Sequence, residues 1–179
     1  MQDYVVRSSI THAESAARRT ADVLLTLFIC AAVVFVLFRF IWVPVVTANP
    51  PVKELEDGDL VLADRISRYF GEYKVGDVVR ADIGEGMNMY RVAAPGGTSV
   101  TVRGGRLYVN GGLLDESEYA SAFDSELDEE LEVPAGSVLL LPDDRSGITE
   151  LEGCVLPVSS VYGKLRLRIC PLSRFTLFD

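Results

Sequence analysis

The sequence predicts a mostly β, mainly antiparallel domain behind one N-terminal transmembrane helix. Three observations lead to this fold class. One apolar run lies near the N-terminus, short β-branched runs separated by turn signals follow it, and no segment after Val46 keeps a long helical period. With 179 residues, 49% of them apolar, the chain can form one compact domain and an accessory segment.

The apolar run extends from Val23 to Val46 and includes one charged residue, Arg39. About 20 apolar residues in a helix cross the hydrocarbon core of a membrane, so we predict a transmembrane helix over residues 23–46. Trp42 suits the membrane interface, and Pro44 cannot continue the helix. A cleaved signal peptide is the alternative, but the run is longer than the apolar region of such signals.

The flanking charges predict the orientation of the chain in the cell membrane. Arg18 and Arg19 lie beside the apolar run and favour a cytoplasmic N-terminus. Residues 1–22 are therefore expected to form a short cytoplasmic tail. Residues 47–179 are expected to form the domain outside the membrane.

The domain after the membrane reads as a series of short strands. Apolar or β-branched runs, bounded by Gly, Pro and Asn, predict strands over residues 60–62, 77–79, 99–102, 107–109, 137–141 and 165–169. Residues 64–73 and 117–132 could each form a short helix. The segment from Asp115 to Glu132 has nine acidic residues and no basic one, and is expected to be a solvated loop. A calcium site there is the alternative, although the spacing does not match an EF-hand loop.

Composition excludes several classes of function. A net charge of −9 argues against binding of nucleic acid through overall charge. His12 is the only histidine, which excludes a Ser-His-Asp triad and a cluster of histidine metal ligands. No cofactor or metal is implied. Cys154 and Cys170 could form a disulfide, which the sequence leaves open because it does not give their separation.

Six fragments carry a resemblance when they are taken together and in order. They are Val46–Leu62 with its Leu-Glu-Asp-Gly-Asp-Leu-Val-Leu ending, Tyr73–Val79, Tyr90–Gly97, Gly105–Gly111, Leu141–Arg145 and Gly163–Leu172. Behind an apolar anchor, this series resembles the signal peptidase I family, peptidase S26. The resemblance implies a signal-peptidase-like antiparallel β domain and a Ser-Lys catalytic dyad.

The two positions of that dyad carry other residues here. Pro50 stands at the nucleophile position when the first fragment is matched without a gap, and Ala48 stands there with a gap. Tyr90 stands at the general-base position. The resemblance therefore implies a catalytically inactive member of the family. An active signal peptidase with an atypical nucleophile, such as Thr47 with Lys53, is the alternative.

The resemblance also suggests partners. The chain is similar to the inactive signal-peptidase-like proteins of Gram-positive pilus assembly. It is therefore expected to be an assembly or chaperone factor for an exported or pilin-like polypeptide, with a sortase as a further candidate partner. An extended polypeptide would bind beside exposed strands, and Val46, Ala48, Leu60 and Val92 are the candidate groove residues. The alternative is that these four are ordinary core residues.

Overall fold

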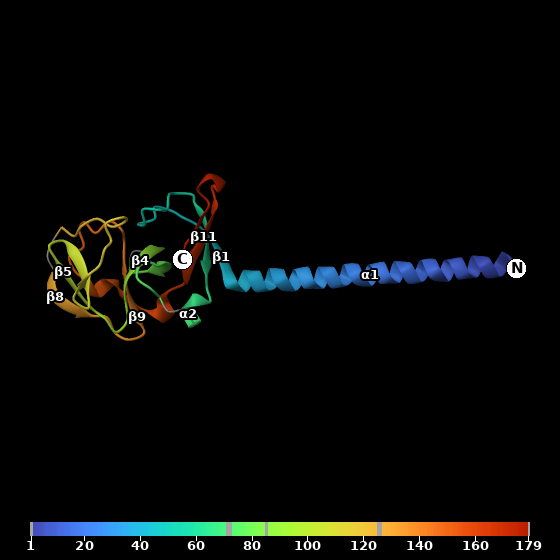
Figure 1. Ribbon diagram of the computed structural model, residues 1–179, viewed down its shortest axis with the longest axis horizontal. Coiled ribbons are helices and arrows are strands. Elements are labelled where there is room, and N and C mark those ends of the chain that lie inside the picture. The colour runs from blue at the N-terminus through green and yellow to red at the C-terminus, as the bar shows by residue number, and fades with distance from the viewer. Residues whose placement is uncertain (1, 71–72, 85, 125–126, 179) are drawn as a thin grey trace. The chain divides into compact units, whose positions relative to one another are not determined.

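The computed structural model describes residues 2–70, 73–84, 86–124 and 127–178. It divides into two compact units at Phe40 and Ile41. The first unit is a single helix, and the second is the β-rich domain (Figure 1).

Helix α1 extends over Gln2–Ile41. Its part from Arg18 to Ile41 contains an 18-residue window with a mean hydropathy of 2.7 and is long and apolar enough, by length and composition, to cross a membrane. The helix ends at Ile41 rather than at Val46. Trp42–Val46 form strand β1 instead, because Pro44 cannot donate a helical hydrogen bond and the neighbouring valines pair with a strand of the domain.

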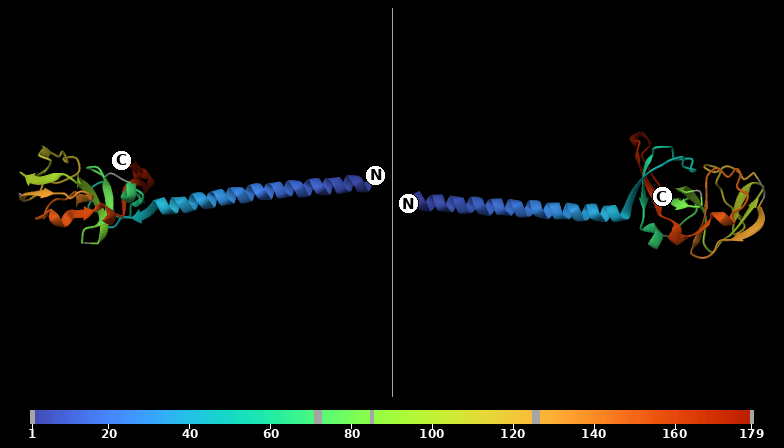
Figure 2. Two further views of the ribbon diagram at one scale, coloured as in Figure 1. Left: turned by 90° about the horizontal axis from the view of Figure 1, so that it is seen from below. Right: turned by 180° about the vertical axis from the view of Figure 1, so that it is seen from behind.

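The domain contains two antiparallel sheets. The larger has the order β1-β2-β11-β3-β4-β9-β10, with β12 paired to β11, and the smaller has the order β7-β6-β5-β8. The strands of the larger sheet are β1 (Trp42–Val46), β2 (Leu60–Asp64), β3 (Val78–Asp82), β4 (Met87–Pro95), β9 (Ser137–Leu141), β10 (Val155–Pro157), β11 (Gly163–Cys170) and β12 (Thr176–Leu177). Those of the smaller sheet are β5 (Ser99–Arg103), β6 (Arg106–Val109), β7 (Gly112–Leu113) and β8 (Leu127–Glu132). Figures 1 and 2 show β5 and β8 at the opposite end of the domain from β1 and β11.

Helices in the domain are short. They are α2 (Ser67–Phe70) and the 3-10 turns η1 (Glu152–Cys154), η2 (Val158–Ser160) and η3 (Leu172–Arg174). Of the helix expected within residues 64–73, the described residues form the single turn α2, and residues 71–72 lie outside the described residues. The helix expected over residues 117–132 is wrong in the part that the structure describes, because residues 117–124 form turn and loop and β8 pairs with β5. Pairing with a neighbouring strand overrides the weak β propensity of the acidic residues in β8.

The six strands expected from the sequence are present as β2, β3, β5, β6, β9 and β11. The sequence patterns do not predict the central strand β4. This strand lies between β3 and β9 and is buried on both faces. Such a strand lacks the alternation of apolar and polar residues that marks a half-exposed one. In the neighbouring β9, Leu139 and Leu141 pack in one apolar cluster and Val138 and Leu140 in another.

Neither Cys154 nor Cys170 forms a disulfide in the structure. Cys154 ends η1, which precedes β10, and Cys170 ends β11. Strands β3, β4 and β9 lie between β10 and β11 in the sheet. Three strands thus separate the elements that carry the two thiols, whereas a disulfide needs Cα atoms about 4.4–6.8 Å apart.

Candidate functional site

The loop between β1 and β2, residues 47–59, carries both expected nucleophile positions. Its two ends are tied together, since the Thr47 amide donates to the Asp59 carbonyl at 2.9 Å and the Gly58 amide donates to the Thr47 carbonyl at 3.0 Å. Gly58 has a φ of 83°, a left-handed conformation that suits glycine. The Thr47 hydroxyl donates to the carbonyls of Glu56 and Asp59, so it holds the loop closed.

The nucleophile positions hold side chains without a reactive atom. Pro50 is half-buried and Ala48 is exposed at the start of the loop. Neither side chain has an oxygen or sulfur that could attack a carbonyl. The buried hydroxyl of Thr47 donates its hydrogen to the loop carbonyls of Glu56 and Asp59.

Tyr90, at the general-base position, lies in the centre of β4 and is 3% exposed. It pairs with Val79 of β3 and packs in an apolar cluster with Val92, Leu140 and Val161. Burial among these side chains follows from the period of the strand, because Tyr90 and Val92 share one face of β4. The position therefore presents a buried phenol where the family resemblance implies an amine.

Tyr90 also borders a pocket of about 430 Å³, called here the Tyr90 pocket. Its lining includes Asn49 and Pro51, which flank Pro50, together with Asn88, Asp144 and Glu150. The Asn88 side-chain amide donates to the Asn49 carbonyl at 3.1 Å and joins β4 to the loop. The fold thus brings Tyr90 and the two neighbours of Pro50 to one pocket.

The three lysines of the chain lie elsewhere. Lys164 is buried on β11, where its Nζ lies 2.7 Å from Asp77 Oδ1. Lys53 is exposed, and its Nζ lies 3.4 Å from the Glu118 carbonyl oxygen. Lys74 is exposed before β3. The lining of the Tyr90 pocket does not include a lysine among the residues that the structure describes.

A buried ion pair fixes the other side of the loop. Arg91 Nε lies 2.8 Å from Asp143 Oδ1, and Arg91 Nη2 lies 3.0 Å from Asp143 Oδ2. Arg91 also pairs with Glu54, and its guanidinium lies 4.0 Å from the ring centre of Tyr119. Burial alone would lower the pKa of Arg91, but its bonds to Asp143 and Glu54 outweigh this and raise it.

Asp143 connects this pair to the loop backbone. Its Oδ2 accepts the Lys53 amide at 2.8 Å, and its own amide donates to the Pro51 carbonyl at 2.8 Å. Residues 51–53 are therefore held against the end of β9. The sequence offered a signal for Asp143 in the Leu-Pro-Asp-Asp-Arg fragment, but none for Glu54, the other carboxylate that pairs with Arg91.

A second buried pair joins Arg145 to Glu116 at 2.6 Å. Burial raises the pKa of Glu116 and lowers the pKa of Arg145, because both charged forms lose solvation. Arg145 Nε and Nη1 have no hydrogen-bond partner among the described residues. The expected solvated loop is thus wrong at Glu116 and at the buried Phe123, which lies under the Arg145 guanidinium.

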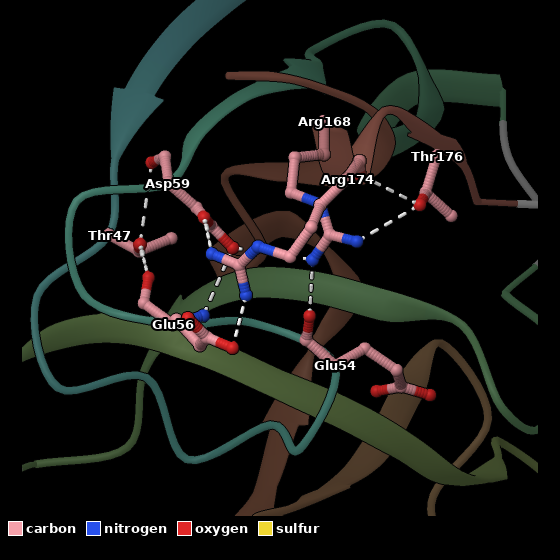
Figure 3. A network of polar contacts seen from close by, with 7 residues as sticks. All are labelled: Thr47, Glu54, Glu56, Asp59, Arg168, Arg174 and Thr176. Carbon is pink, nitrogen blue, oxygen red and sulfur yellow. Dashed lines mark hydrogen bonds and ion pairs between the residues drawn. The ribbon is translucent and has the colours of Figure 1, made fainter. Parts of the chain in front are cut away.

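A third group of charges joins the loop to the end of the chain (Figure 3). Arg168 Nη1 lies 3.3 Å from the buried carboxylate of Asp59. Arg174, in η3, pairs with Asp59 and with Glu56. Thr176 accepts a bond from Arg168 Nη2 at 3.0 Å. The C-terminal segment therefore closes onto the loop that follows β1.

The candidate groove residues occupy different environments. Val46 and Leu60 are paired across β1 and β2, with Val46 65% exposed and Leu60 half-buried. Ala48 is exposed just beyond this pair. Val92 is fully buried in the centre of β4. The structure thus places Val46, Leu60 and Ala48 near one another along the chain's first hairpin, and Val92 in the core.

The described residues hold no group of three or more His, Cys, Asp or Glu side chains arranged to bind a metal ion. The charged side chains around the loop instead form ion pairs with one another and hydrogen bonds with the loop backbone.

Comparison with known proteins gives consistent matches. A family model described as signal peptidase, peptidase S26, matches residues 20–169. The inactive signal peptidase IA of Staphylococcus aureus strain N315 is 23% identical over 169 residues, which cover 89% of this chain and 97% of that protein. Signal peptidase I of Leptolyngbya laminosa is 30% identical over 132 residues, 67% of this chain and 64% of that protein.

Two further matches are more partial. Thylakoidal processing peptidase 1, chloroplastic, of Arabidopsis thaliana is 28% identical over 134 residues, so the match spans 67% of this chain and 39% of that protein. The crystal structure of a signal peptidase I from Enterococcus faecalis V583 matches with a TM-score of 0.39 and 17% identity, covering 52% of this chain and 96% of that one.

Proposed function

Because the chain belongs to the signal peptidase family, peptidase S26, we propose that it is a non-catalytic member. It is anchored in the cell membrane by α1 and acts as an assembly or chaperone factor for exported polypeptides. Its N-terminus is cytoplasmic and its β domain lies outside. The observation that carries this proposal is the replacement of both dyad residues, with Pro50 or Ala48 at one position and the buried Tyr90 at the other.

The positions of the lysines support the loss of chemistry. A Ser-Lys mechanism needs an unprotonated amine within hydrogen-bond reach of the nucleophile. Lys164 is committed to Asp77, and Lys53 reaches the Glu118 carbonyl and does not line the Tyr90 pocket. Thr47 gives its hydroxyl hydrogen to loop carbonyls. An atypical Thr47–Lys53 dyad would require both side chains to leave these partners.

The first hairpin supports binding of an extended polypeptide. Strand β1 stands at the end of the sheet order, so its outer edge is available to a further strand. Pro44 lies within β1, and proline is tolerated in sheets on edge strands because it has no amide hydrogen to donate. Val46 and Ala48 offer small apolar side chains beside that edge.

Pilus biogenesis is the specific process that we propose for this factor, with a pilin-like client and a sortase as candidate partners. The support is the resemblance of the chain to signal-peptidase-like proteins of pilus systems, in which both dyad residues are also replaced. Relatives named inactive signal peptidase IA support the loss of peptidase activity.

The test uses the full chain in detergent micelles and a fluorescent signal peptide with an Ala-x-Ala site. We expect binding, seen as a rise in anisotropy, without any cleavage product in the mass spectrum. Val46→Asp should weaken binding by about tenfold, because it places a charge beside the strand edge. Val75→Asp, at an exposed valine outside β1, is the matched control.

Cleavage by the unaltered chain would contradict the non-catalytic proposal. A further arm compares Pro50→Ser/Tyr90→Lys, which restores the two side-chain types of the dyad. Peptide that is neither bound nor cleaved would contradict the binding role. Capture of pilin and sortase from cells, with the Val46→Asp chain as control, then tests the pilus assignment.

A further inference from the structure

One end of the larger sheet carries a basic and aromatic surface that the proposed function does not use. We propose that this surface, called here the α2 surface, docks on the anionic lipid headgroups of the membrane that α1 crosses. The inference rests on the proposed function, because it takes α1 as the membrane anchor. The members of the α2 surface are the exposed or half-buried residues Arg65, Ile66, Arg68, Tyr69 and Tyr162.

The α2 surface begins where the chain leaves the apolar segment. Ile41 is both the last residue of α1 and the first residue of the β domain. The Arg65 amide donates to the Ile41 carbonyl at 3.0 Å, and Asp64 pairs with Trp42, the next residue along. Because a hydrogen bond joins Arg65 directly to the residue that ends the apolar helix, the surface starts at the level where that helix leaves the hydrocarbon.

The register of three neighbouring strands brings the other members to the same end of the sheet. Trp42 of β1 pairs with Asp64 of β2, and Asp64 pairs with Lys164 of β11. Antiparallel pairing therefore places Tyr162, which precedes Lys164 by two residues, opposite the chain just after Asp64, where Ile66 lies. Figure 1 shows α2 at the end of the domain where β1 begins. The exposed side chains thus gather at one end of the sheet.

Hydrogen bonds fix α2 in this place. Asp64 Oδ1 accepts the Ile66 amide at 2.7 Å, and Asp64 Oδ2 accepts the Ser67 hydroxyl at 2.7 Å. Arg68 Nη2 donates to the Ser159 carbonyl at 3.4 Å, which joins α2 to η2. The turn is therefore held to β2 on one side and to η2 on the other, so its outward side chains are preorganised for a partner.

The aromatic and apolar members are exposed to an extent that suits a membrane interface. Tyr69 is 70% exposed, Tyr162 is 50% exposed and Ile66 is 40% exposed. Tyrosine is enriched at the level of the headgroups, because its ring is apolar and its hydroxyl can reach water. Transfer of these side chains from water into the interface would remove apolar area from water.

The arginines of the α2 surface carry uncompensated charge. Arg65 and Arg68 form no ion pair with a described residue. The carboxylate beside them in the sequence, Asp64, pairs with Arg166, whose Nε lies 3.4 Å from it. The chain as a whole has a net charge of −9, so an anionic bilayer repels the protein in general and attracts it at this surface.

The membrane anchor makes a small surface sufficient for docking. Because the β domain is joined to the apolar helix at Ile41, docking loses little freedom of translation. Each arginine beside an anionic bilayer is expected to strengthen docking by about fivefold. A second copy of the chain would instead have to reach this surface within the headgroup layer.

The test places the full chain in lipid nanodiscs of phosphatidylcholine, with or without an equal part of phosphatidylglycerol. Trp42 is the only tryptophan, so Trp42→Phe/Tyr69→Trp leaves one reporter on the α2 surface. Trp42→Phe/Leu113→Trp places the reporter at an exposed residue of the smaller sheet. Lipids that carry a spin label on the headgroup quench a tryptophan in the headgroup layer. We expect strong quenching at position 69 with phosphatidylglycerol, weaker quenching without it or at high salt, and little at position 113.

Arg65→Gln/Arg68→Gln, added to the chain with its reporter at position 69, removes the charge. We expect the ratio of docked to undocked domain to fall about twentyfold in the discs with phosphatidylglycerol. The matched control is Arg103→Gln/Arg106→Gln, at two exposed arginines that pair across β5 and β6, and it should keep the quenching. Equal quenching of the two reporters would overturn the inference, as would quenching at position 69 that is independent of phosphatidylglycerol and of both arginines.

A second measurement separates failure of the inference from failure of the proposed function. Co-elution of the chain with the nanodisc reports the anchor alone. A chain that stays in the disc without headgroup contact at position 69 overturns the inference and leaves the anchor standing, whereas a chain that leaves the disc contradicts both. Protection of position 69 from a water-soluble quencher only in discs with two chains would assign the surface to a second copy and overturn the inference.

Discussion

Arg91 and Asp143 determine where the loop after β1 lies. The two hydrogen bonds between their side chains are buried. Asp143 also forms hydrogen bonds with the backbone carbonyl of Pro51 and the backbone amide of Lys53. A carboxylate with three such partners can fix a loop, because each bond would be left unmade if the loop moved. The same loop carries Pro50, so these residues position the site without taking part in chemistry.

Glu116 gives a pH-dependent contribution to stability. Burial raises its pKa above the ordinary value, so the folded chain holds this proton to a higher pH than the unfolded chain does. The stability that this proton confers is complete below the unfolded pKa and is lost as pH rises through the folded pKa. We expect the unfolding free energy of the wild type to fall, relative to that of Glu116→Gln, as pH rises above about 4.5.

Chemical denaturation at a series of pH values, followed by circular dichroism, measures this difference. Glu118→Gln, at an exposed neighbouring glutamate, is the matched control and should leave the stability close to that of the wild type. A Glu116→Gln curve parallel to the wild-type curve would show that the folded and unfolded pKa values are equal.

At the scale of elements, β11 connects the two halves of the larger sheet. It pairs with β2 on one side and with β3 and β12 on the other, and it shifts register twice along β2. These irregularities allow one strand to serve three partners. The first hairpin, which carries the proposed strand-binding edge, is therefore held through β11.

Gly163, the first residue of β11, packs closely against the backbone of Asp64 at the end of β2. A Cβ atom at this position would lie 2.7 Å from the Asp64 carbonyl oxygen, which belongs to the backbone and cannot move aside alone. We expect Gly163→Ala to lower the unfolding free energy by about 1–3 kcal/mol through this overlap. Denaturant midpoints measured by circular dichroism on the full chain would report the loss.

Gly112→Ala is the control for this prediction. A Cβ there would meet the Val109 carbonyl oxygen at 3.5 Å, an ordinary contact, so the midpoint should change little. Equal midpoints for the Gly163→Ala and Gly112→Ala chains would mean that β11 can move away from β2 at no cost.

On the scale of the whole domain, the loop after the first strand contacts the C-terminal segment. The loop after β1 supplies Asp59 and Glu56, and the C-terminal segment supplies Arg168 and Arg174 (Figure 3). Asp59 is fully buried, so removal of a partner leaves a buried charge that is only partly compensated. The position of the loop therefore depends on residues near the end of the sequence.

Arg174→Gln should loosen the loop without unfolding the domain. Loss of the Arg174 charge removes one ion pair that ties the loop after β1, at Asp59, to the C-terminal segment. We therefore expect the amides of Thr47 and Gly58 to exchange hydrogen about tenfold faster. Exchange followed by mass spectrometry or NMR measures this effect. Arg103→Gln, at an exposed arginine of β5, is the control, and unchanged protection of the loop in Arg174→Gln would contradict the closure.

The sequence by itself determined the family and the fold class, and it placed Pro50 or Ala48 and Tyr90 at the positions expected for the dyad. Motif order and the apolar run are local features, and residues such as Gly58 and Pro44 act through their own backbone. Six strands were predicted because short β-branched runs between turn signals form strands wherever they pack. The absence of Ser and Lys at the matched positions likewise needs no coordinates.

Only the tertiary structure decided which charges are paired. The partners of Arg91, Arg145 and Asp59 are distant in sequence, and no local pattern relates Glu54, Glu116 or Arg174 to them. The boundary of α1, the central strand β4 and the acidic strand β8 also depend on neighbours that only folding supplies.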